Sequence, residues 1–486
     1  MTHDSGETMS TSNFPKFDEQ RYLDEEDSVP SPDFRSAFQN DRDRILYSSA
    51  FRRLAGVTQV AAVREHHLLH NRLTHSLKVA QIGRRMAQQL VNDHDLFGIE
   101  DKSWLADIVE AAGLAHDIGH PPFGHIAEAV LQEELASFGA SFEGNAQSFR
   151  LVTRLASRKN GMDGLNLTRA TLNAMLKYPQ YKHEVSDGRS SHEWHNRGYG
   201  VKWGVYKSER EWFEFARLSP PAATSRDSDP KVRSTAAALV DWADDVSYAI
   251  HDVADYFRAG LIPLDIIHLE SHLPSKGQMT RRARFIEFAK KELGNRYSQF
   301  DPDRFEDQYD RLVADLKLEE PWSDTRDDRY ELNSVQRKLH QLFCTGVRGL
   351  DHPPYVEVDI DHQYQVEALK QFTWYYVIKQ PSLSVAQKGQ SAIIKSLLAE
   401  LMAMLEKYEP ASKFTSQIPN YLRNRYESVL EFAAHNPGVM ATEEYCRART
   451  VCDYLCALTE DQTIDLYERI TGYSVSRGSI FGAWFH

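Results

Sequence analysis

Histidine residues gather in one part of the sequence, next to aspartates, in a pattern that would suit a divalent metal ion. Eight of the twenty histidines lie within positions 66–125, where an even distribution would place about 2.5. Neutral imidazole and carboxylate are both good ligands for first-row divalent metals. By clustering alone, a solvated histidine-rich surface is the more frequent outcome, so both interpretations stay open at this point. The eight histidines are His66, His67, His70, His75, His94, His116, His120 and His125.

The pair His116-Asp117 strengthens the metal hypothesis because it ends an apolar predicted helix. A carboxylate buried there needs a partner, and a metal ion would supply one. The segment 119–122 (Gly-His-Pro-Pro) then stops the helix and turns the chain back towards it. His125 and Glu128 follow at a spacing of three, so on a helix they share a face and can pair.

A further ligand is expected from a distant helix, predicted over 235–258. Asp244, Tyr248 and Asp252 are spaced four apart, so they share one side of this helix. Periodicity alone favours a solvated face, and a tyrosine between two aspartates also suits sugar or phosphate recognition. The opposite side is an apolar stripe of Leu239, Trp242, Val246, Ile250, Val253 and Phe257.

The elements that must position these residues are mostly helical. Apolar residues recur at steps of three and four between Leu73 and Leu90 and again between Trp104 and Ala115, which predicts two helices that carry the histidines. Further helices are predicted near 280–294, 303–318, 328–348, 390–408 and 442–471. Strand patterns are confined to 355–360 and the segment from Val201 to Tyr206, and 183–205 is predicted to be a long loop. The expected fold class is all-α.

Three parts of the chain differ in texture. Residues 1–38 are polar, acidic and dotted with Ser and Pro, which predicts a flexible or loosely docked arm. Residues 39–262 contain the histidines and aspartates described above and are predicted to form the core. Residues 263–486 are charged and helical and are predicted to complete the core and to supply oligomer contacts.

Composition excludes several classes of protein. The net charge of −13 gives no support to a generic polyanion binder, although a local basic patch stays possible. Four cysteines are too few for a disulfide scaffold. The chain shows no signal-peptide pattern and no run of about 18 apolar residues, so we expect a soluble cytoplasmic protein without membrane contact. No GxxxxGK[ST] motif occurs, and the glycines at 198–204 are only a near miss to a dinucleotide pattern.

Several motifs together resemble the deoxyguanosinetriphosphate triphosphohydrolase family of the HD-domain metal-dependent phosphohydrolases. The His-Asp dipeptide is weak by itself, but its surroundings are specific. The resemblance covers about residues 40–260 and resumes near 449–459, whereas about 265–440 show no residue-by-residue match. The motifs are FRRL (51–54), TQV (58–60), NRLTHS (71–76), AHDIGHPPFGH (115–125), FEGNAQ (142–147), ADDVSY (243–248) and RTVCDY (449–454).

The resemblance implies hydrolysis of a deoxynucleoside triphosphate, with dGTP the first candidate, to the deoxynucleoside and tripolyphosphate by water attack at the α-phosphorus. The implied metal ligands are His75, His116, Asp117 and Asp244, with Asp245 as an alternative to Asp244; the spacing to Tyr248 favours Asp244. The metal would be divalent, with Mn²⁺, Mg²⁺, Co²⁺ and Fe²⁺ all suited to such ligands. The implied catalytic residues are His125, oriented by Glu128, and His120.

The resemblance also implies substrate contacts and partners. Arg72, Lys177 and Tyr178 would contact phosphates, although a lone Lys-Tyr pair is as often a surface feature. Gln59, Tyr248 and Asp252 would select the deoxyribose. Members of the family are homo-oligomers, commonly tetramers or hexamers, and some respond to a second nucleotide; single-stranded DNA is a further possible effector.

Two other classes of function stay open at the sequence level. One is another HD phosphohydrolase, acting on nucleoside monophosphates or cyclic dinucleotides. The other is a non-catalytic regulator that binds nucleotides or single-stranded nucleic acid. The sequence does not indicate which base is preferred.

Overall fold

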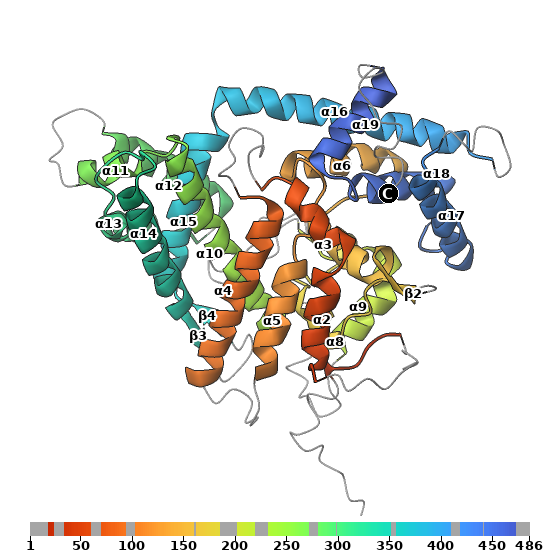
Figure 1. Ribbon diagram of the computed structural model, residues 1–486, viewed down its shortest axis with the longest axis horizontal. Coiled ribbons are helices and arrows are strands. Elements are labelled where there is room, and N and C mark those ends of the chain that lie inside the picture. The colour runs from red at the N-terminus through yellow and green to blue at the C-terminus, as the bar shows by residue number, and fades with distance from the viewer. Residues whose placement is uncertain are drawn as a thin grey trace, which may run out of the picture.

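The computed structural model (Figure 1) describes residues 18–23, 34–59, 70–93, 103–159, 162–184, 202–218, 232–271, 280–297, 299–350, 356–409, 418–440 and 442–472. Most of the predicted arm lies outside these ranges, as do His66, His67, His94, Val201 and most of the predicted loop. Within the arm, residues 18–23 dock on the core. Arg21 Nη1 lies 2.6 Å from Asp41 Oδ1 and donates to the Asn166 carbonyl at 2.5 Å.

The centre of the molecule is a group of packed helices that includes the two helices predicted to carry histidines. α4 (Arg72–Asp93) packs along α5 (Ser103–Ala115), and both contact α10 (Thr235–Arg258). α2 (Ala37–Leu46) covers α5 and begins at a capping box in which Ser36 and Gln39 exchange hydrogen bonds. The smaller elements around this centre are α3 (Ser49–Arg53), α7 (Gly144–Arg150), α8 (Arg169–Ala174) and α9 (Arg210–Arg217).

α10 confirms the prediction for 235–258 at both ends. The Ser234 hydroxyl accepts a hydrogen bond from the Ala237 amide and so begins the helix. The predicted apolar stripe is buried along its whole length. The opposite side is not a solvated face, because Asp252 is only 5% exposed and Asp244 packs among charged neighbours.

A second group of helices packs against α10 on the side away from α5, at the left of Figure 1. It confirms the helices predicted near 280–294, 303–318 and 328–348 to within a few residues. One apolar core joins this group to the centre, because Phe285 and Val366 belong to the same buried cluster as Val246. The helices are α11 (Leu264–Ser271), α12 (Arg281–Arg296), α13 (Pro302–Leu316), α14 (Arg326–Thr345) and α15 (Ile360–Thr373).

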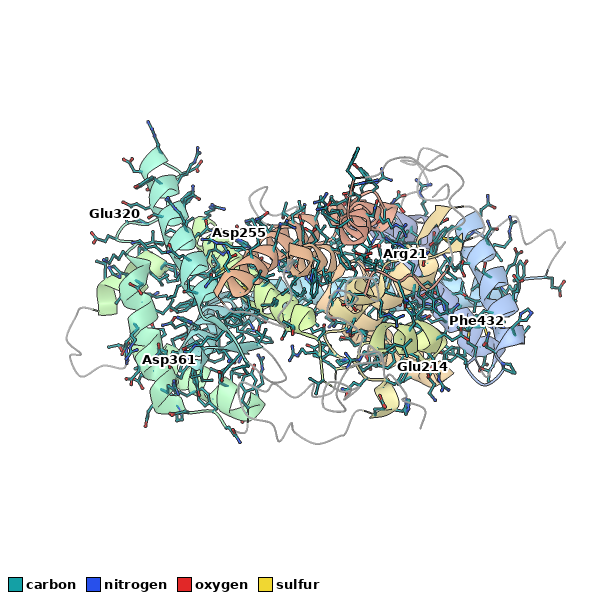
Figure 2. All side chains as sticks on the ribbon, turned by 90° about the horizontal axis from the view of Figure 1, so that it is seen from below. Arg21, Glu214, Asp255, Glu320, Asp361 and Phe432 are labelled. Atoms are coloured by element: carbon teal, nitrogen blue, oxygen red, sulfur yellow. The ribbon has the colours of Figure 1, made fainter. Side chains whose placement is uncertain are left out.

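A third group surrounds α6 (His125–Leu135) and has its own buried apolar cluster. The long α16 (Pro381–Glu406) begins nine residues before the predicted 390, because Pro381 occupies its first turn. The other helices are α17 (Asn420–His435), α18 (Glu443–Leu455) and α19 (Glu460–Thr471). The second and third groups lie at opposite ends of the molecule. Figure 2 shows Phe432 of α17 at one end and Glu320 and Asp361 at the other.

Two sequence predictions were wrong. The single helix predicted over 442–471 is two helices, because Thr459 caps α19 in a capping box with Gln462. The segment up to Tyr206 forms only an isolated bridge between Val205 and Tyr181 rather than a strand.

Strands are few, and the all-α fold class is confirmed. β3 (Val347–Gly349) pairs antiparallel with β4 (Val356–Val358), inside the strand predicted at 355–360. β1 (Ser157–Lys159) and β2 (Met162–Asp163) form the other small sheet among the described residues. In the ranges given above, none of the helices combines the length and the apolarity that a membrane span requires.

Candidate metal centre and active site

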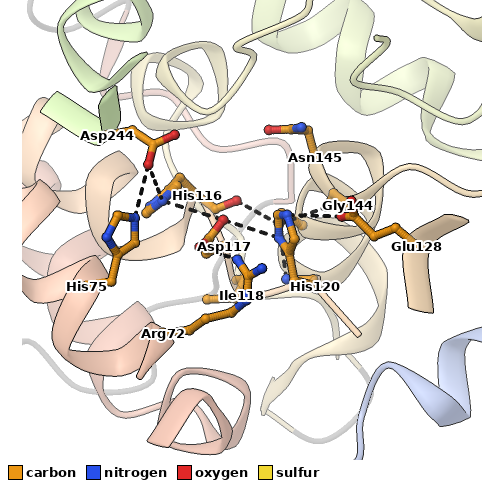
Figure 3. A network of polar contacts seen from close by, with 12 residues as sticks. Arg72, His75, His116, Asp117, Ile118, His120, Glu128, Gly144, Asn145 and Asp244 are labelled. Carbon is orange, nitrogen blue, oxygen red and sulfur yellow. Dashed lines mark hydrogen bonds and ion pairs between the residues drawn. The ribbon is translucent and has the colours of Figure 1, made fainter. Parts of the chain in front are cut away.

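Three helices and one turn bring the predicted metal ligands together (Figure 3). His75 lies in the first turn of α4, His116 and Asp117 directly follow α5, and Asp244 lies in the middle of α10. Nitrogen and oxygen atoms of His75, His116 and Asp117 all lie within 4.8 Å of one another. Asp244 Oδ1 lies 3.0 Å from His75 Nε2 and 3.6 Å from His116 Nε2.

His116 presents a free nitrogen to this cluster. Its Nδ1 donates to the Gly113 carbonyl at 2.7 Å, which fixes the ring and directs Nε2 inward. Nε2 is buried, makes no hydrogen bond, and lies 3.5 Å from Asp117 Oδ1. Burial opposes a charge on this ring, but Asp117, Asp244 and the carbonyl outweigh it and raise the pKa of His116 to about 9. The surroundings of Nε2 therefore favour positive charge.

The other three candidate ligands have the protonation states that metal binding needs. Burial lowers the pKa of the His75 imidazole despite the neighbouring Asp244, which favours the neutral ring. Burial opposes ionisation of Asp117 and Asp244, but neighbouring cations and imidazoles lower the pKa of each carboxyl below its usual range. The two imidazoles and two carboxylates, with His116 Nε2 left without a hydrogen bond, form a donor set that fits a divalent ion.

Asp245, the alternative to Asp244, points elsewhere. Its Oδ1 accepts a hydrogen bond from Lys370 Nζ of α15 at 2.6 Å. It therefore engages α15, whereas Asp244 faces the two histidines. The geometry supports Asp244 as the ligand.

A chain of imidazoles and carboxylates leads from Asp117 to the surface. His120 Nδ1 lies 3.2 Å from Asp117 Oδ1, and His120 Nε2 lies 3.1 Å from Glu128 Oε1. Glu128 Oε2 in turn accepts from His125 Nδ1 at 2.8 Å, so the predicted pair of His125 and Glu128 is present. The His125 side chain is 70% exposed, whereas that of Glu128 is 11% exposed. His125 is thus a held but solvent-accessible imidazole beside the candidate metal cluster.

Burial and neighbouring charges give the two inner members of this chain different roles. Burial lowers the pKa of His120 to about 4 even though Asp117 and Glu128 favour its charge, so the ring is neutral near pH 7. Burial opposes the charge of Glu128, but His120 and His125 lower its pKa below the usual range. An ionised Glu128 can orient the imidazole of His125 and stabilise a proton on it.

Gly144, the first residue of α7, allows this arrangement. A side-chain carbon at Gly144 would lie 2.3 Å from Glu128 Oε1 and 2.7 Å from His120 Nε2. Glu143 begins the helix, because its carboxylate accepts from the Asn145 and Ala146 amides. Sequence reasoning noted the FEGNAQ motif but assigned no role to its glycine.

The predicted phosphate contacts lie beside the cluster. Arg72 Nη1 donates to Asp117 Oδ2 at 2.5 Å, while its Nε and Nη2 are buried without a hydrogen-bond partner. Lys177 Nζ lies 3.0 Å from Asp244 Oδ2 and 2.6 Å from Asp241 Oδ1. The adjacent Tyr178 is neutral, since burial raises the pKa of its hydroxyl.

Lys202 is a cation near the site that sequence reasoning missed. It lies in the part of the predicted loop that the structure describes, and its Nζ lies 3.2 Å from Glu143 Oε1. The sequence offered no signal for it beyond its place in a long loop.

Of the three residues predicted to contact the sugar, Tyr248 and Asp252 contact each other, and Gln59 and Asp252 each keep an oxygen without a hydrogen bond. Tyr248 hydrogen-bonds to Asp252, and burial followed by the charge of Asp252 raises the pKa of the Tyr248 hydroxyl. Burial and Asp255 raise the pKa of Asp252, whose Oδ2 is buried without a hydrogen-bond partner. Gln59 Oε1 is likewise buried and unpartnered. The structure thus leaves polar atoms of Gln59 and Asp252 available to a ligand.

Two residues far apart in sequence hold the turn that carries these groups. Arg53 donates to the carbonyls of Ile118 and His120, and also to that of Leu458. Glu460, at the start of α19, accepts from the Thr58 amide at 2.9 Å, the Thr58 hydroxyl at 2.6 Å and the Phe123 amide at 3.2 Å. Neither contact could be inferred from local spacing.

Two family models match parts of this chain. Residues 72–249, which contain all four candidate ligands, match the HD domain family, and residues 356–469 match the phosphohydrolase-associated domain. The second match covers about half of the region that the sequence motifs had left unassigned.

Two relatives align with nearly the whole chain, and a third aligns with about half of it. A deoxyguanosinetriphosphate triphosphohydrolase-like protein of Streptomyces coelicolor is 31% identical over 474 residues, which cover 93% of this chain and 96% of the relative. One of Bifidobacterium longum is 27% identical over 482 residues, covering 96% and 89%. One of Mesorhizobium japonicum is 40% identical over 250 residues, about half of each chain. The chain therefore belongs to the family of deoxyguanosinetriphosphate triphosphohydrolase-like proteins, which is built on the HD phosphohydrolase domain.

Proposed function

We propose that the protein hydrolyses deoxynucleoside triphosphates, dGTP among them, to the deoxynucleoside and tripolyphosphate. Water attacks the α-phosphorus, a new P–O bond forms, and the bond from that phosphorus to the sugar O5′ breaks. The observation that carries the proposal is a series of close approaches, each of 3.2 Å or less, that leads from Asp117 through His120 and Glu128 to the exposed His125. Family membership supports the same class of reaction.

The metal ligands of the proposal are His75, His116, Asp117 and Asp244. A bound divalent ion would supply Lewis-acid stabilisation for the negative charge that develops on the phosphate. Arg72 acts beside it, because its two unpartnered donor nitrogens can reach phosphate oxygens while Nη1 stays fixed on Asp117. Lys177 adds a second cation next to Asp244.

The acid of the proposed reaction is His125. A deoxynucleoside alkoxide is a poor leaving group, so O5′ must receive a proton as its bond to phosphorus breaks. Glu128 holds Nδ1 of His125, which leaves Nε2 to deliver that proton. His120 keeps Glu128 in place from the buried side.

The deoxyribose is assigned to the pocket beside Tyr248. Asp252 and Gln59 each offer a buried oxygen that could accept a hydrogen bond from the sugar 3′-hydroxyl. Tyr178 lies next to Lys177 and is assigned to the phosphates. Cytoplasmic location, a homo-oligomeric state and an effector (a second nucleotide or single-stranded DNA) complete the proposal.

Product analysis tests the reaction. The protein incubated with each dNTP and Mn²⁺ should release deoxynucleoside and tripolyphosphate in equal amounts. His125→Ala should lower kcat about 10²–10⁴-fold with unchanged metal content, because it removes only the acid. Release of monophosphate and pyrophosphate, or full activity of His125→Ala, would overturn this assignment.

A further inference from the structure

A pocket of about 400 Å³ lies between α4, α10 and α14, which pack against one another left of the centre of Figure 1. None of its lining residues is a candidate metal, acid or sugar residue of the site described above. Pockets of this size commonly hold small ligands. The lining includes Lys78, Arg85, His251, Arg337, His340 and Cys344.

Three of the ten residues that line this pocket carry a positively charged side chain. Lys78 and Arg85 are seven residues apart on α4 and so share a face, and Arg337 approaches from α14. The described lining contains no carboxylate. Neither arginine forms an ion pair with any carboxylate in the parts of the chain that the structure describes. Three cations therefore surround the pocket without an acidic partner in its wall.

Asp255, the acidic side chain whose charge acts on Lys78, is already paired with other groups. Asp255 Oδ2 lies 2.5 Å from His70 Nδ1, and Asp255 Oδ1 lies 3.4 Å from Arg258 Nη1. His70 Nε2 in turn lies 2.6 Å from Lys78 Nζ, so His70 stands between the lysine and the carboxylate. The lysine is thus held at the pocket without being neutralised by direct contact with an acid.

Two histidines line the pocket from neighbouring helices. The rings of His251 and His340 lie 5.4 Å apart, between their centroids. His340 Nδ1 is buried without a hydrogen-bond partner. Burial, with the charges of Lys78 and Arg85, lowers the pKa of His340 to about 4, so the positive field of both cations reaches this ring.

We propose that this pocket binds a small phosphate-bearing anion at a site separate from the proposed substrate site. Arginine forks match phosphate oxygens in pairs, and a lysine adds a third charge-assisted donor. His340 Nδ1 supplies a further polar atom that the protein itself leaves unused. The phosphate can belong to an inorganic polyphosphate or to a phosphorylated small molecule.

The pocket connects to the candidate metal centre through three side chains. His251 Nδ1 lies 3.0 Å from Ser247 Oγ, and Ser247 Oγ lies 3.5 Å from His75 Nδ1. Lys78 also follows His75 by one turn on α4. A bound anion that moves Lys78 or His251 therefore acts on the orientation of His75. This consequence rests on the proposed function, whereas the binding itself does not.

Calorimetric titration of the full chain with inorganic pyrophosphate, after removal of metal by a chelator, tests the binding. Wild type should bind, and Arg85→Gln and Arg337→Gln should each weaken binding about tenfold, the loss of one charge-assisted hydrogen bond. Lys338→Gln, one residue from Arg337 on α14 but outside the pocket lining, is the matched control and should bind as wild type does.

Lys177→Gln separates this pocket from the substrate site. If that variant lost pyrophosphate binding while the two arginine variants kept it, the anion would occupy the substrate site and the proposal would fall. Wild-type affinity in both arginine variants would also overturn it. All of these outcomes are independent of any hydrolytic activity.

A parallel titration distinguishes the sources of the phosphate. Tighter binding of pyrophosphate than of a sugar phosphate or nucleoside monophosphate assigns the pocket to inorganic polyphosphate, and the reverse order assigns it to a phosphorylated small molecule. Arg337→Gln should weaken binding of the preferred ligand about tenfold if that ligand binds here.

Discussion

His116 and its neighbours argue most directly for a cation at the centre of the site. The Gly113 carbonyl holds Nδ1, and the two aspartates surround an Nε2 that has no hydrogen-bond partner. A buried polar atom without a hydrogen-bond partner raises the free energy of the folded protein. A divalent ion between His116 and Asp244 would satisfy that nitrogen and the carboxylates together.

The two adjacent aspartates of α10 provide a matched test of this centre. Asp244→Asn should remove most of the bound metal and abolish hydrolysis, because loss of one ligand costs both affinity and geometry. Asp245→Asn should retain the metal, since its carboxylate contacts Lys370 instead. Elemental analysis of both purified variants decides between them. Equal metal content in the two variants would contradict the assignment of Asp244.

Substitution of Gly144 tests the groups that hold the proposed acid His125, and not the metal ligands. Gly144→Ala should lower kcat by at least about tenfold at unchanged metal content, because its new methyl group would displace Glu128 and His120. Gly389→Ala in α16 is the control: no atom lies within 4 Å of the added carbon, and alanine favours a helix by up to about 1 kcal/mol. Turnover measurements with metal quantification compare the two. A fully active Gly144→Ala would show that the positions of Glu128 and His120 do not matter.

Tyr248 carries the prediction about the sugar. GTP should be hydrolysed much more slowly than dGTP, because a ring packed beside C2′ leaves no room for a hydroxyl, and a shift of about 1 Å at the phosphorus costs roughly 10²-fold. Tyr248→Ala should narrow the ratio of kcat/KM for dGTP over GTP, partly by slowing dGTP. Competition assays with both nucleotides measure that ratio. Equal kcat/KM values for the wild type would exclude this pocket as the site of discrimination.

At the scale of elements, local signals predicted several helices in which a cap and an apolar stripe coincide, although the capped α2 was missed. α10 is the clearest case, with Ser234 at its start and one continuous buried face. The boundary between α18 and α19 was missed because Thr459 interrupts a sequence that stays periodic on both sides. α15 was also missed, because it is buried on nearly all sides and shows no polar stripe.

The same limit applies to the site. Spacing predicted the contact between His125 and Glu128, since both lie in the first turn of one helix. The roles of Glu460 and Lys202 depend on contacts across hundreds or tens of residues, which no local pattern encodes. Long-range contacts therefore account for most of what sequence reasoning missed.

Glu460 gives the prediction at this scale. It joins α19 to the residue before Gln59 and to Phe123, a non-glycine residue held at φ +66 just before the acid His125. Such a backbone conformation costs of order 1–2 kcal/mol and needs support from its surroundings. Glu460→Gln should therefore lower kcat several-fold through the turn, with little change in metal content.

Glu468→Gln, on the same helix, is the control for that variant and should match wild type in kcat, KM and metal content. Glu460→Asp should recover less activity than wild type, because the shorter side chain cannot reach both amides. An unchanged kcat in Glu460→Gln would show that the turn holds its shape without α19.

At the scale of the whole molecule, the boundary proposed at residue 262 does not divide the apolar core. Val246 and Phe257 before it share one buried cluster with Phe285 and Val366 after it. The separate cluster around α6 and α16–α18 lies against the same centre, and it includes Leu131 and Val451 from distant parts of the chain. The boundaries at 38 and 262 and the oligomer contacts of residues 263–486 stay predictions. Limited proteolysis can test the boundaries, and light scattering can test the oligomer contacts.

A buried charge network connects this separate cluster to the centre. Arg150, the last residue of the short α7, lies 2.8 Å from Asp453 Oδ2 of α18 and 2.7 Å from Glu209 Oε1. Gln147 donates to Asp453 Oδ1 at 2.9 Å, and Arg449 lies 3.2 Å from the same oxygen. All of these charged side chains are at most 3% exposed. Breaking such a pair leaves an uncompensated buried charge, which commonly costs about 3–5 kcal/mol.

Low pH should therefore weaken the buried charge network that connects α18 to the central helices. Burial opposes the charge of Asp453, but Arg150 and Arg449 outweigh it and lower its pKa to about 2. Because the folded-state pKa lies below the usual Asp value of about 3.9, the stabilisation is fully present above pH 4 and is lost as the pH falls through 2. The difference of nearly two units corresponds to about 2–3 kcal/mol. Urea unfolding of wild type between pH 5 and 2 should show this loss.

Comparison of two variants isolates Asp453 from the other carboxylates that titrate in the same range. Asp453→Asn should be less stable than wild type at pH 7, since Arg150 loses its buried partner, and its free energy of unfolding should fall less between pH 4 and 2. Asp324→Asn removes a carboxylate from an exposed pair with Arg329, which water and salt screen, and should follow the wild-type curve. If Asp453→Asn and wild type lost equal stability over that interval, the network would not be the acid-sensitive join between α18 and the centre of the molecule.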